Sequence, residues 1–203
     1  MKRMLIVGGQ GTIGACVRDH FASTHEIVTA GRTTGDLRVD LTDSESIGQM
    51  LLALGEVDSI LCIAGEAKWA PFDELTEEDY DLGLKSKLMG QVNLVRLGRS
   101  VLKPSGSITL TTGILADHPV NMTTSAAMVN GGIHSFVKAV SLELRESMRI
   151  NAVSSGMVEE AAEKYEAYFP GHNPVPMWKV KNAYSRSVHG LETGQIFRVY
   201  EMG

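Results

Sequence analysis

The chain of 203 residues is poor in cysteine, has no excess of basic residues and contains no long apolar run. Its two cysteines, Cys16 and Cys62, each lie in an apolar stretch, which indicates buried thiols in a reducing compartment and excludes a disulfide-rich scaffold. Nineteen Lys and Arg against 24 Asp and Glu give a net charge of −5, and no basic cluster favours nucleic acid. Since no segment approaches the roughly 18 apolar residues of a spanning helix, we expect a cytoplasmic protein without a membrane or nucleic-acid partner.

The order of apolar segments predicts a layered α/β fold. A hydrophobic fraction of 43% and a charged fraction of 21% are typical of a globular protein, and the length suits one domain over residues 1–203. Stretches with helical spacing separate seven strand-like runs: Leu5–Val7, Ile27–Ala30, Leu37–Val39, Ile60–Ile63, Ile108–Thr111, Ile150–Val153 and Ile196–Tyr200. Most runs are apolar throughout, as in strands covered on both faces. We therefore predict a doubly wound parallel sheet of about seven strands with helices on both faces.

Two local signals refine this prediction. The spacing Thr42-x-x-Glu45 is a capping box, and apolar residues at helical spacing from Ile47 to Leu54 follow it, which predicts a helix that begins there. Three prolines between Pro170 and Pro176 predict an irregular loop.

A glycine loop follows the first predicted strand. The spacing Gly8-x-x-Gly11-x-x-Gly14 lies between the run that ends at Val7 and a predicted helix over Thr12–Phe21. Glycines let the backbone turn tightly and approach a pyrophosphate, whose charge then lies at the positive end of the helix. The pattern favours a Rossmann fold that binds a dinucleotide, although an ordinary strand-to-helix turn is the alternative. The residues assigned to the cofactor here are Gly8, Gly9, Gln10, Gly11, Thr12, Ile13 and Gly14.

The end of the second predicted strand bears on the choice of cofactor. An acidic residue at this place binds the ribose hydroxyls of NAD, whereas an arginine suits the 2′-phosphate of NADP. The sequence has Arg32 and Thr33 there, with no carboxylate before Asp36. We therefore expect NADP(H), with Arg32 on the phosphate and Thr33 assisting, while NAD stays possible and Arg32 as a solvated loop residue is the alternative.

Beyond these features, the chain resembles the short-chain dehydrogenase/reductase family over nearly its whole length. The segments that carry the resemblance are Asp40-Leu41-Thr42, Ile63-Ala64-Gly65, Ser141-Leu142-Glu143-Leu144, Arg149-Ile150-Asn151-Ala152-Val153-Ser154-Ser155-Gly156 and Thr193-Gly194-Gln195. The resemblance implies an oxidoreductase whose Asp40 and Leu41 face the adenine and whose Ala64 and Gly65 line the cofactor. Ile63 replaces the usual asparagine before Ala-Gly, Ser155 replaces a proline, and the glycine spacing is nearer the family's epimerase-like branch.

The family's catalytic residues are missing. Nowhere does a lysine follow a tyrosine four positions later, although the family transfers its proton through that Tyr-x-x-x-Lys pair. Counting back from Glu143 places the tyrosine on Ala126, the lysine on Asn130 and the serine on Gly113, and the helical asparagine falls on Lys87. Loss of a positioned acid typically costs on the order of 10²–10⁴ in rate.

Several residues are candidates for the vacant roles. Lys87 offers an ammonium from the neighbouring helix, although a solvated lysine beside Lys85 is the alternative. Thr111 and Thr112 lie at a strand end and offer hydroxyls that bind a carbonyl. His118 lies in a predicted loop, and histidine is the residue type best suited to proton exchange near neutral pH. His134 on the next helix is interpreted as a packed, hydrogen-bonded histidine. We assign no metal site.

Three functional hypotheses remain open. The first is an NADP(H)-dependent oxidoreductase with a rearranged proton relay, acting on a small molecule. The second is an inactive nucleotide-binding pseudoenzyme that senses redox cofactor or serves as an interaction module. The third and weakest is epimerase or isomerase chemistry.

Two further expectations come from the resemblance. The helix over Ala126–Leu144 implies a homodimer or homotetramer, because its equivalent pairs between subunits. The loop over Val158–Met177, which carries Glu159, Glu160, Tyr165 and Tyr168, corresponds to the segment that covers the substrate.

Overall fold

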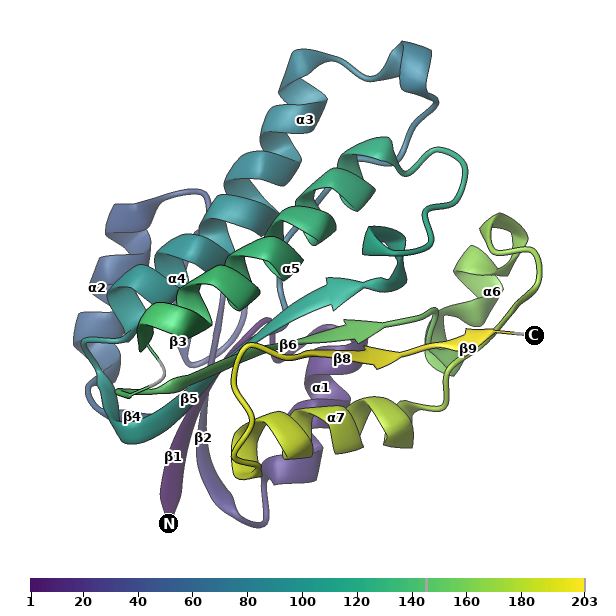
Figure 1. The fold of residues 1–203 in the computed structure, drawn as a ribbon. Coiled ribbons are helices and arrows are strands. Elements are labelled where there is room, and N and C mark those ends of the chain that lie inside the picture. Colours follow the sequence, from purple (N-terminus) through teal and green to yellow (C-terminus); the bar gives the residue numbers. More distant parts are fainter. Residues whose placement is uncertain (145, 203) are drawn as a thin grey trace.

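One parallel sheet organises the chain, which the computed structural model describes over residues 1–144 and 146–202. Its strands lie in the order β3-β2-β1-β4-β5-β6-β8, and every neighbouring pair is parallel (Figure 1). The strands are β1 (Lys2–Val7), β2 (His25–Gly31), β3 (Leu37–Arg38), β4 (Val57–Cys62), β5 (Leu102–Gly113), β6 (Arg149–Ser155) and β8 (Ile196–Val199). The order reverses between β1 and β4, which confirms the predicted doubly wound sheet and leaves a crevice beyond the carboxyl ends of these two strands.

Helices cover both faces of the sheet, as Figure 1 shows. The α-helices are α1 (Thr12–Phe21), α2 (Ser44–Leu54), α3 (Glu77–Gly83), α4 (Gly90–Gly98), α5 (Thr124–Leu144), α6 (Ala162–Tyr165) and α7 (Met177–His189). A π-helical turn, η2 (Leu84–Met89), joins α3 to α4, and short 3₁₀ turns are η1 (Phe72–Glu74), η3 (Ile114–Ala116), η4 (Glu159–Ala161) and η5 (Glu166–Tyr168). Among the described residues, no helix has both the length and the apolar character needed to cross a membrane.

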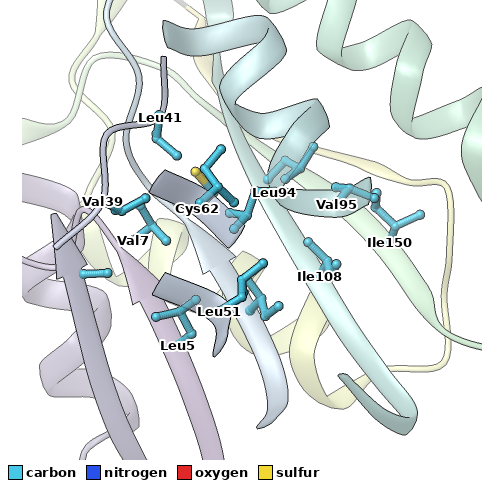
Figure 2. Close-up of a cluster of buried hydrophobic side chains, with 14 of the residues drawn as sticks. Leu5, Val7, Val39, Leu41, Leu51, Cys62, Leu94, Val95, Ile108 and Ile150 are labelled. Carbon is cyan, nitrogen blue, oxygen red and sulfur yellow. The ribbon is translucent and has the colours of Figure 1, made fainter. Parts of the chain in front are cut away.

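Alternating side chains of the strands build a core on each face. On one face, Leu5 and Val7 of β1 pack with α2 and α4 side chains such as Leu51 and Leu94 (Figure 2). On the other face, Met4 and Ile6 of β1 pack with residues of α1 and α7, including the fully buried Tyr184. Burial on both faces explains why the strands read as continuous apolar runs in the sequence.

The start of α2 differs from the prediction. The capping residue is Asp43, whose side chain accepts a hydrogen bond from the Glu45 amide at 2.8 Å, and the helix begins at Ser44. Thr42 instead donates its hydroxyl to Asp40 Oδ1 at 2.8 Å. The predicted capping box at Thr42 is therefore wrong, because Asp40 takes the threonine hydroxyl and leaves the cap to the next residue.

A small antiparallel pair was absent from the prediction. Strand β7 (His172–Asn173) lies within the proline-containing loop and pairs with β9 (Glu201–Met202). The pairing fastens the loop that follows β6 to the carboxyl-terminal residues. Two-residue strands carry too little pattern to be read from sequence.

Candidate functional site

The glycine loop between β1 and α1 forms a tight turn with open space above it. Gly8 has a φ of +85° and donates its amide to Ala30 O at 2.8 Å, and a side chain on Gly14 would collide with the Gly8 carbonyl oxygen. Gly11 precedes α1 and is different, because a Cβ there would meet nothing closer than 3.7 Å. The first turn of α1 has no side-chain cap and no acidic residue. Free amides and open space together suit an anion at the start of α1.

A cavity of about 230 Å³ adjoins this loop at the carboxyl edge of the sheet. It is lined by Val7, Gly8, Gln10, Gly11, Ala30, Gly31, Arg32, Thr33, Thr34, Val39, Asp40, Leu41, Ala64, Gly65, Glu66 and Ser86. Nine of the residues assigned to the cofactor are therefore together: Gly8, Gln10, Gly11, Arg32, Thr33, Asp40, Leu41, Ala64 and Gly65. Gly9, Thr12, Ile13 and Gly14 are not among the lining residues, and Ile13 packs into the core below α1.

The rim of this first cavity carries one cation and two carboxylates. Arg32 Nη2 lies 3.0 Å from Glu66 Oε1, and both side chains are more than half exposed. Asp40 also lines the cavity, and hydrogen bonds from the Thr42 amide and hydroxyl lower the pKa of its carboxyl. Asp36 is turned away, because its carboxylate accepts hydrogen bonds from the amide and hydroxyl of Thr29 at 2.8 Å each.

A second cavity of about 320 Å³ adjoins the first, since Gly65 and Glu66 line both. Its other lining residues are Ala67, Trp69, Lys87, Thr112, Gly113, Leu115, Ala126 and Asn130. The four positions that the resemblance gives to the catalytic residues, Lys87, Gly113, Ala126 and Asn130, thus surround one space. Only Lys87 among these four has an ionisable side chain.

Lys87 projects into this second cavity, whereas Lys85 lies on the surface and binds Asp81 at 2.6 Å. The Lys87 stem lies against Gly65, where a Cβ would come within 2.9 Å of the Lys87 Cγ. Burial lowers the pKa of the Lys87 ammonium. The structure therefore favours a Lys87 side chain that points into the cavity over one that points into solvent.

Asn130 holds the end of β5 to α5. Its side-chain oxygen accepts the Gly113 amide at 3.0 Å, and its side-chain nitrogen donates to Ala126 O at 2.7 Å. With both polar ends occupied, Asn130 keeps the cavity wall in place and offers no cation where the family has its lysine.

Thr112 and Thr111 point to opposite faces of the sheet. Thr112 lines the second cavity, and its hydroxyl lies 2.8 Å from Nε2 of the buried His134. Burial lowers the pKa of His134 to about 4, so its imidazole is neutral at neutral pH. Thr111 is not among the residues around either cavity. Its hydroxyl lies 2.6 Å from the Tyr184 hydroxyl, on the α7 side of the sheet.

His118 lies outside both cavities. It is exposed, and its ring is 6.0 Å from that of Tyr200 and 6.4 Å from that of His172. Its neighbour Asp117 forms a bidentate ion pair with Arg198 and accepts the Tyr200 hydroxyl at 2.7 Å. These bonds lower the pKa of Asp117 to about 2 and connect the η3 turn to the carboxyl-terminal residues.

An aromatic cluster covers one side of the second cavity. Trp69, from the loop after β4, has its ring 5.4 Å from Tyr165, 5.8 Å from Tyr168 and 6.3 Å from Phe169. Tyr165 and Tyr168 belong to the predicted covering loop. Trp69 and Glu66 were missed as site residues, although their position just after the Ala64-Gly65 turn was a usable signal.

The segment Thr193–Gln195, just before β8, packs against β6 and the end of α5. Gly194 has a φ of +73°, donates its amide to Ile150 O at 2.7 Å and leaves no room for a side chain over Ser141. The Asn151 side chain accepts the Gln195 amide at 3.0 Å. The segments Ser141–Leu144, Arg149–Gly156 and Thr193–Gln195, which carry much of the resemblance, are therefore in contact.

Comparisons with known proteins agree with this architecture. A family model described as enoyl-(acyl carrier protein) reductase matches residues 12–188. The L-xylulose reductase of Bos taurus is 26% identical over 180 residues, which cover 77% of this chain and 72% of the reductase. The solved structure of lin1944 from Listeria innocua is 42% identical and superposes with a TM-score of 0.96 over 98% of this chain and all of its own. A small-chain dehydrogenase solved in complex with NADPH is 25% identical, with a TM-score of 0.86 over 98% of this chain and 96% of its own.

Proposed function

Because the chain belongs to the short-chain dehydrogenase/reductase family, we propose that it is an NADP(H)-dependent oxidoreductase that acts on a small molecule with a rearranged active site. The observation that carries the proposal is that the cavity at the glycine loop adjoins the cavity at the family's catalytic positions, with Gly65 and Glu66 in the walls of both. The NADPH complex of the small-chain dehydrogenase supports the same choice of cofactor by similarity.

The residues around the first cavity fit a phosphorylated dinucleotide. The open space over Gly11 and the uncapped start of α1 suit a pyrophosphate. Arg32 offers a guanidinium for a 2′-phosphate, while Asp36, the nearest carboxylate after β2 in the sequence, is held by Thr29 away from the cavity. When bound, the nicotinamide supplies hydride chemistry.

Lys87 is the residue that we assign to the missing lysine's role. Its ammonium enters the second cavity from η2 instead of α5. On α5, the family's lysine position is held by Asn130, whose side chain is hydrogen-bonded to Gly113 and Ala126. An ammonium there can donate a hydrogen bond to a ribose hydroxyl or to a substrate oxygen. Thr112 offers a second hydroxyl for a carbonyl oxygen.

A nucleotide-binding pseudoenzyme is the second candidate. The observation in its favour is that Ala126 and Gly113 contribute no side-chain polar group, so no phenol and no serine hydroxyl face the cavity at the family's positions. Such a protein would bind the cofactor without turnover.

Cofactor binding is the first test, with NADPH and NADH titrated by calorimetry against wild type and Arg32→Ala. Arg38→Ala is the matched control, because Arg38 is exposed, binds the Gly35 carbonyl oxygen and lies outside the cavity. We expect wild type to prefer NADPH, Arg32→Ala to lose that preference and Arg38→Ala to keep it. Absence of binding by either nucleotide would contradict both candidates.

Turnover separates the two candidates. We expect oxidation of NADPH by a panel of small aldehydes and ketones, with a fall in kcat for Lys87→Met and little change for Lys85→Met. Tight NADPH binding without turnover on any carbonyl compound would favour the pseudoenzyme.

We also propose a homodimer or homotetramer built on α5. Met128 and Leu142 are 45% and 73% exposed and lie 14 residues apart, which is nearly four helical turns and places them on one side of α5. We expect light scattering to report an oligomer that Leu142→Lys weakens, and a monomeric wild type would contradict this.

A further inference from the structure

Lys87 places an amino group without a counterion in a partly apolar cavity. Among the described residues, its side-chain nitrogen has no hydrogen bond and no ion pair. Trp69, Leu115 and Ala126 supply apolar walls around it. A lysine in such a place is stabilised as the neutral amine, which is a nucleophile.

The ionisable groups near Lys87 do not compensate its charge. Glu66 lines the same cavity, but its carboxylate is bound to Arg32 at 3.0 Å. The Cys62 thiol is fully buried, and burial raises its pKa to about 11, so it is uncharged at neutral pH. The lowered pKa of Lys87 has the same physical cause, namely desolvation without a partner.

The side chain is also held in position. Gly65, with a φ of +132°, brings its backbone against the Lys87 stem, so that the amine is directed from η2 into the cavity. A fixed stem with a free amine suits attack on a carbonyl carbon, because the reacting nitrogen does not have to be drawn from solvent.

We propose that Lys87 is a nucleophilic lysine that forms an imine with small aldehydes or ketones in the second cavity. The neutral amine attacks the carbonyl carbon, and one amine proton passes to the carbonyl oxygen to give a carbinolamine. The second amine proton then leaves with that oxygen as water, and a carbon–nitrogen double bond remains. The step needs no oxidant, no reductant and no nucleotide. The step uses the same side chain that the proposed function gives to the ribose or the substrate oxygen, and it is tested without cofactor, so that failure of either proposal is seen separately.

Lys85 is a matched control on the same turn. It lies two residues earlier, is exposed, and binds Asp81 at 2.6 Å, which raises its pKa. Because burial lowers the pKa of Lys87 and Asp81 raises that of Lys85, a larger fraction of Lys87 is neutral amine at the same pH. The two lysines therefore differ in burial and in the fraction of neutral amine, and both react in the same protein and the same mixture.

The experiment is reductive trapping with propanal and sodium cyanoborohydride at pH 7, followed by peptide mass spectrometry. Cyanoborohydride reduces the iminium to a stable propyl-lysine, and we expect Lys87 to gain it several-fold faster than Lys85. Repeating the reaction in urea should abolish the difference, and Lys87→Arg should remove this adduct alone. Labelling of Lys87 no faster than Lys85 in the folded protein would overturn the proposal.

Discussion

Arg32 Nη2 and Glu66 Oε1 lie 3.0 Å apart and join the segments after β2 and β4 at the rim of the first cavity. Glu66 occupies one nitrogen of the Arg32 guanidinium, and its carboxylate repels a 2′-phosphate that binds the same side chain. Exposed ion pairs of this kind contribute only about 0–1 kcal/mol, so a doubly charged phosphate can replace the carboxylate. Under the proposed function, Glu66 therefore weakens the binding of NADPH without preventing it.

From this we predict that Glu66→Gln tightens NADPH binding about two- to fivefold, because the competing carboxylate and its repulsion of the phosphate are removed. NADH, which lacks the 2′-phosphate, should bind as before. Glu26→Gln is the matched control, since Glu26 pairs with Arg3 on the surface at 3.1 Å, outside the cavity. Calorimetric Kd values test this, and an equal change for both nucleotides would contradict the competition.

Gly14→Ala should destabilise the protein by about 1–3 kcal/mol, because the new methyl group meets the Gly8 carbonyl oxygen and forces the glycine loop to move. Gly131→Ala in α5 is the control. A Cβ there has no neighbour within 4 Å, and alanine favours a helix by about 1 kcal/mol over glycine. Urea unfolding should therefore move in opposite directions for the two variants, and a stabilised Gly14→Ala would show that the turn is looser than described.

Asn130→Ala should lower the free energy of unfolding by about 1–3 kcal/mol, since it leaves the Gly113 amide without its acceptor. Asn182→Ala on the exposed side of α7 removes a side chain of the same size and should change the free energy by less than about 0.5 kcal/mol. Chemical denaturation measures both. Equal effects would mean that Asn130 does not hold the wall of the second cavity.

His134 makes stability depend on pH between about 6.5 and 4. Its pKa in the folded protein is about 4, below the ordinary 6.5, so the unfolded chain takes up a proton in this range that the folded protein does not. Stability is therefore full above pH 6.5 and falls as the pH decreases. The free energy of unfolding of wild type should drop by about 2–3 kcal/mol more than that of His134→Gln between pH 7 and pH 4.5.

Other groups do not obscure this comparison. The pKa of Asp117 is lowered to about 2, so its contribution is lost only below the ordinary pKa of 3.8. Burial also lowers the pKa values of His20, His25 and His189, and these losses are common to both proteins. Parallel curves for wild type and His134→Gln would contradict the assignment.

The sequence was informative where a pattern has one physical cause. Strands buried on both faces are apolar throughout, and all seven strands of the main sheet were located, although β1 and β5 extend several residues beyond the apolar runs Leu5–Val7 and Ile108–Thr111. The count from Glu143 selected Gly113, Ala126, Asn130 and Lys87, and all four line one cavity, while their correspondence to the family's catalytic residues stays a prediction.

The hydrogen-bond partners and directions of individual side chains were not predictable in the same way. The Thr42 hydroxyl can cap a helix or bind a neighbouring carboxylate, and only the folded position of Asp40 decides between the two. The inward direction of Lys87 depends on the π-helical turn Leu84–Met89, which departs from the helical period that a sequence pattern assumes. Thr111 and Thr112 read alike in sequence, but alternation along β5 directs one to Tyr184 and the other to His134.

The pairing of β7 with β9 has a practical consequence for experiments on this protein. Residues 201–202 hold the loop whose aromatic side chains lie against Trp69, and Tyr200 is bonded to Asp117 just before them. Any affinity tag or fusion partner joined after residue 202 would leave the molecule next to the β7–β9 pair that holds this loop. Ligand measurements should therefore use a tag at the amino end, where Met1 is 85% exposed.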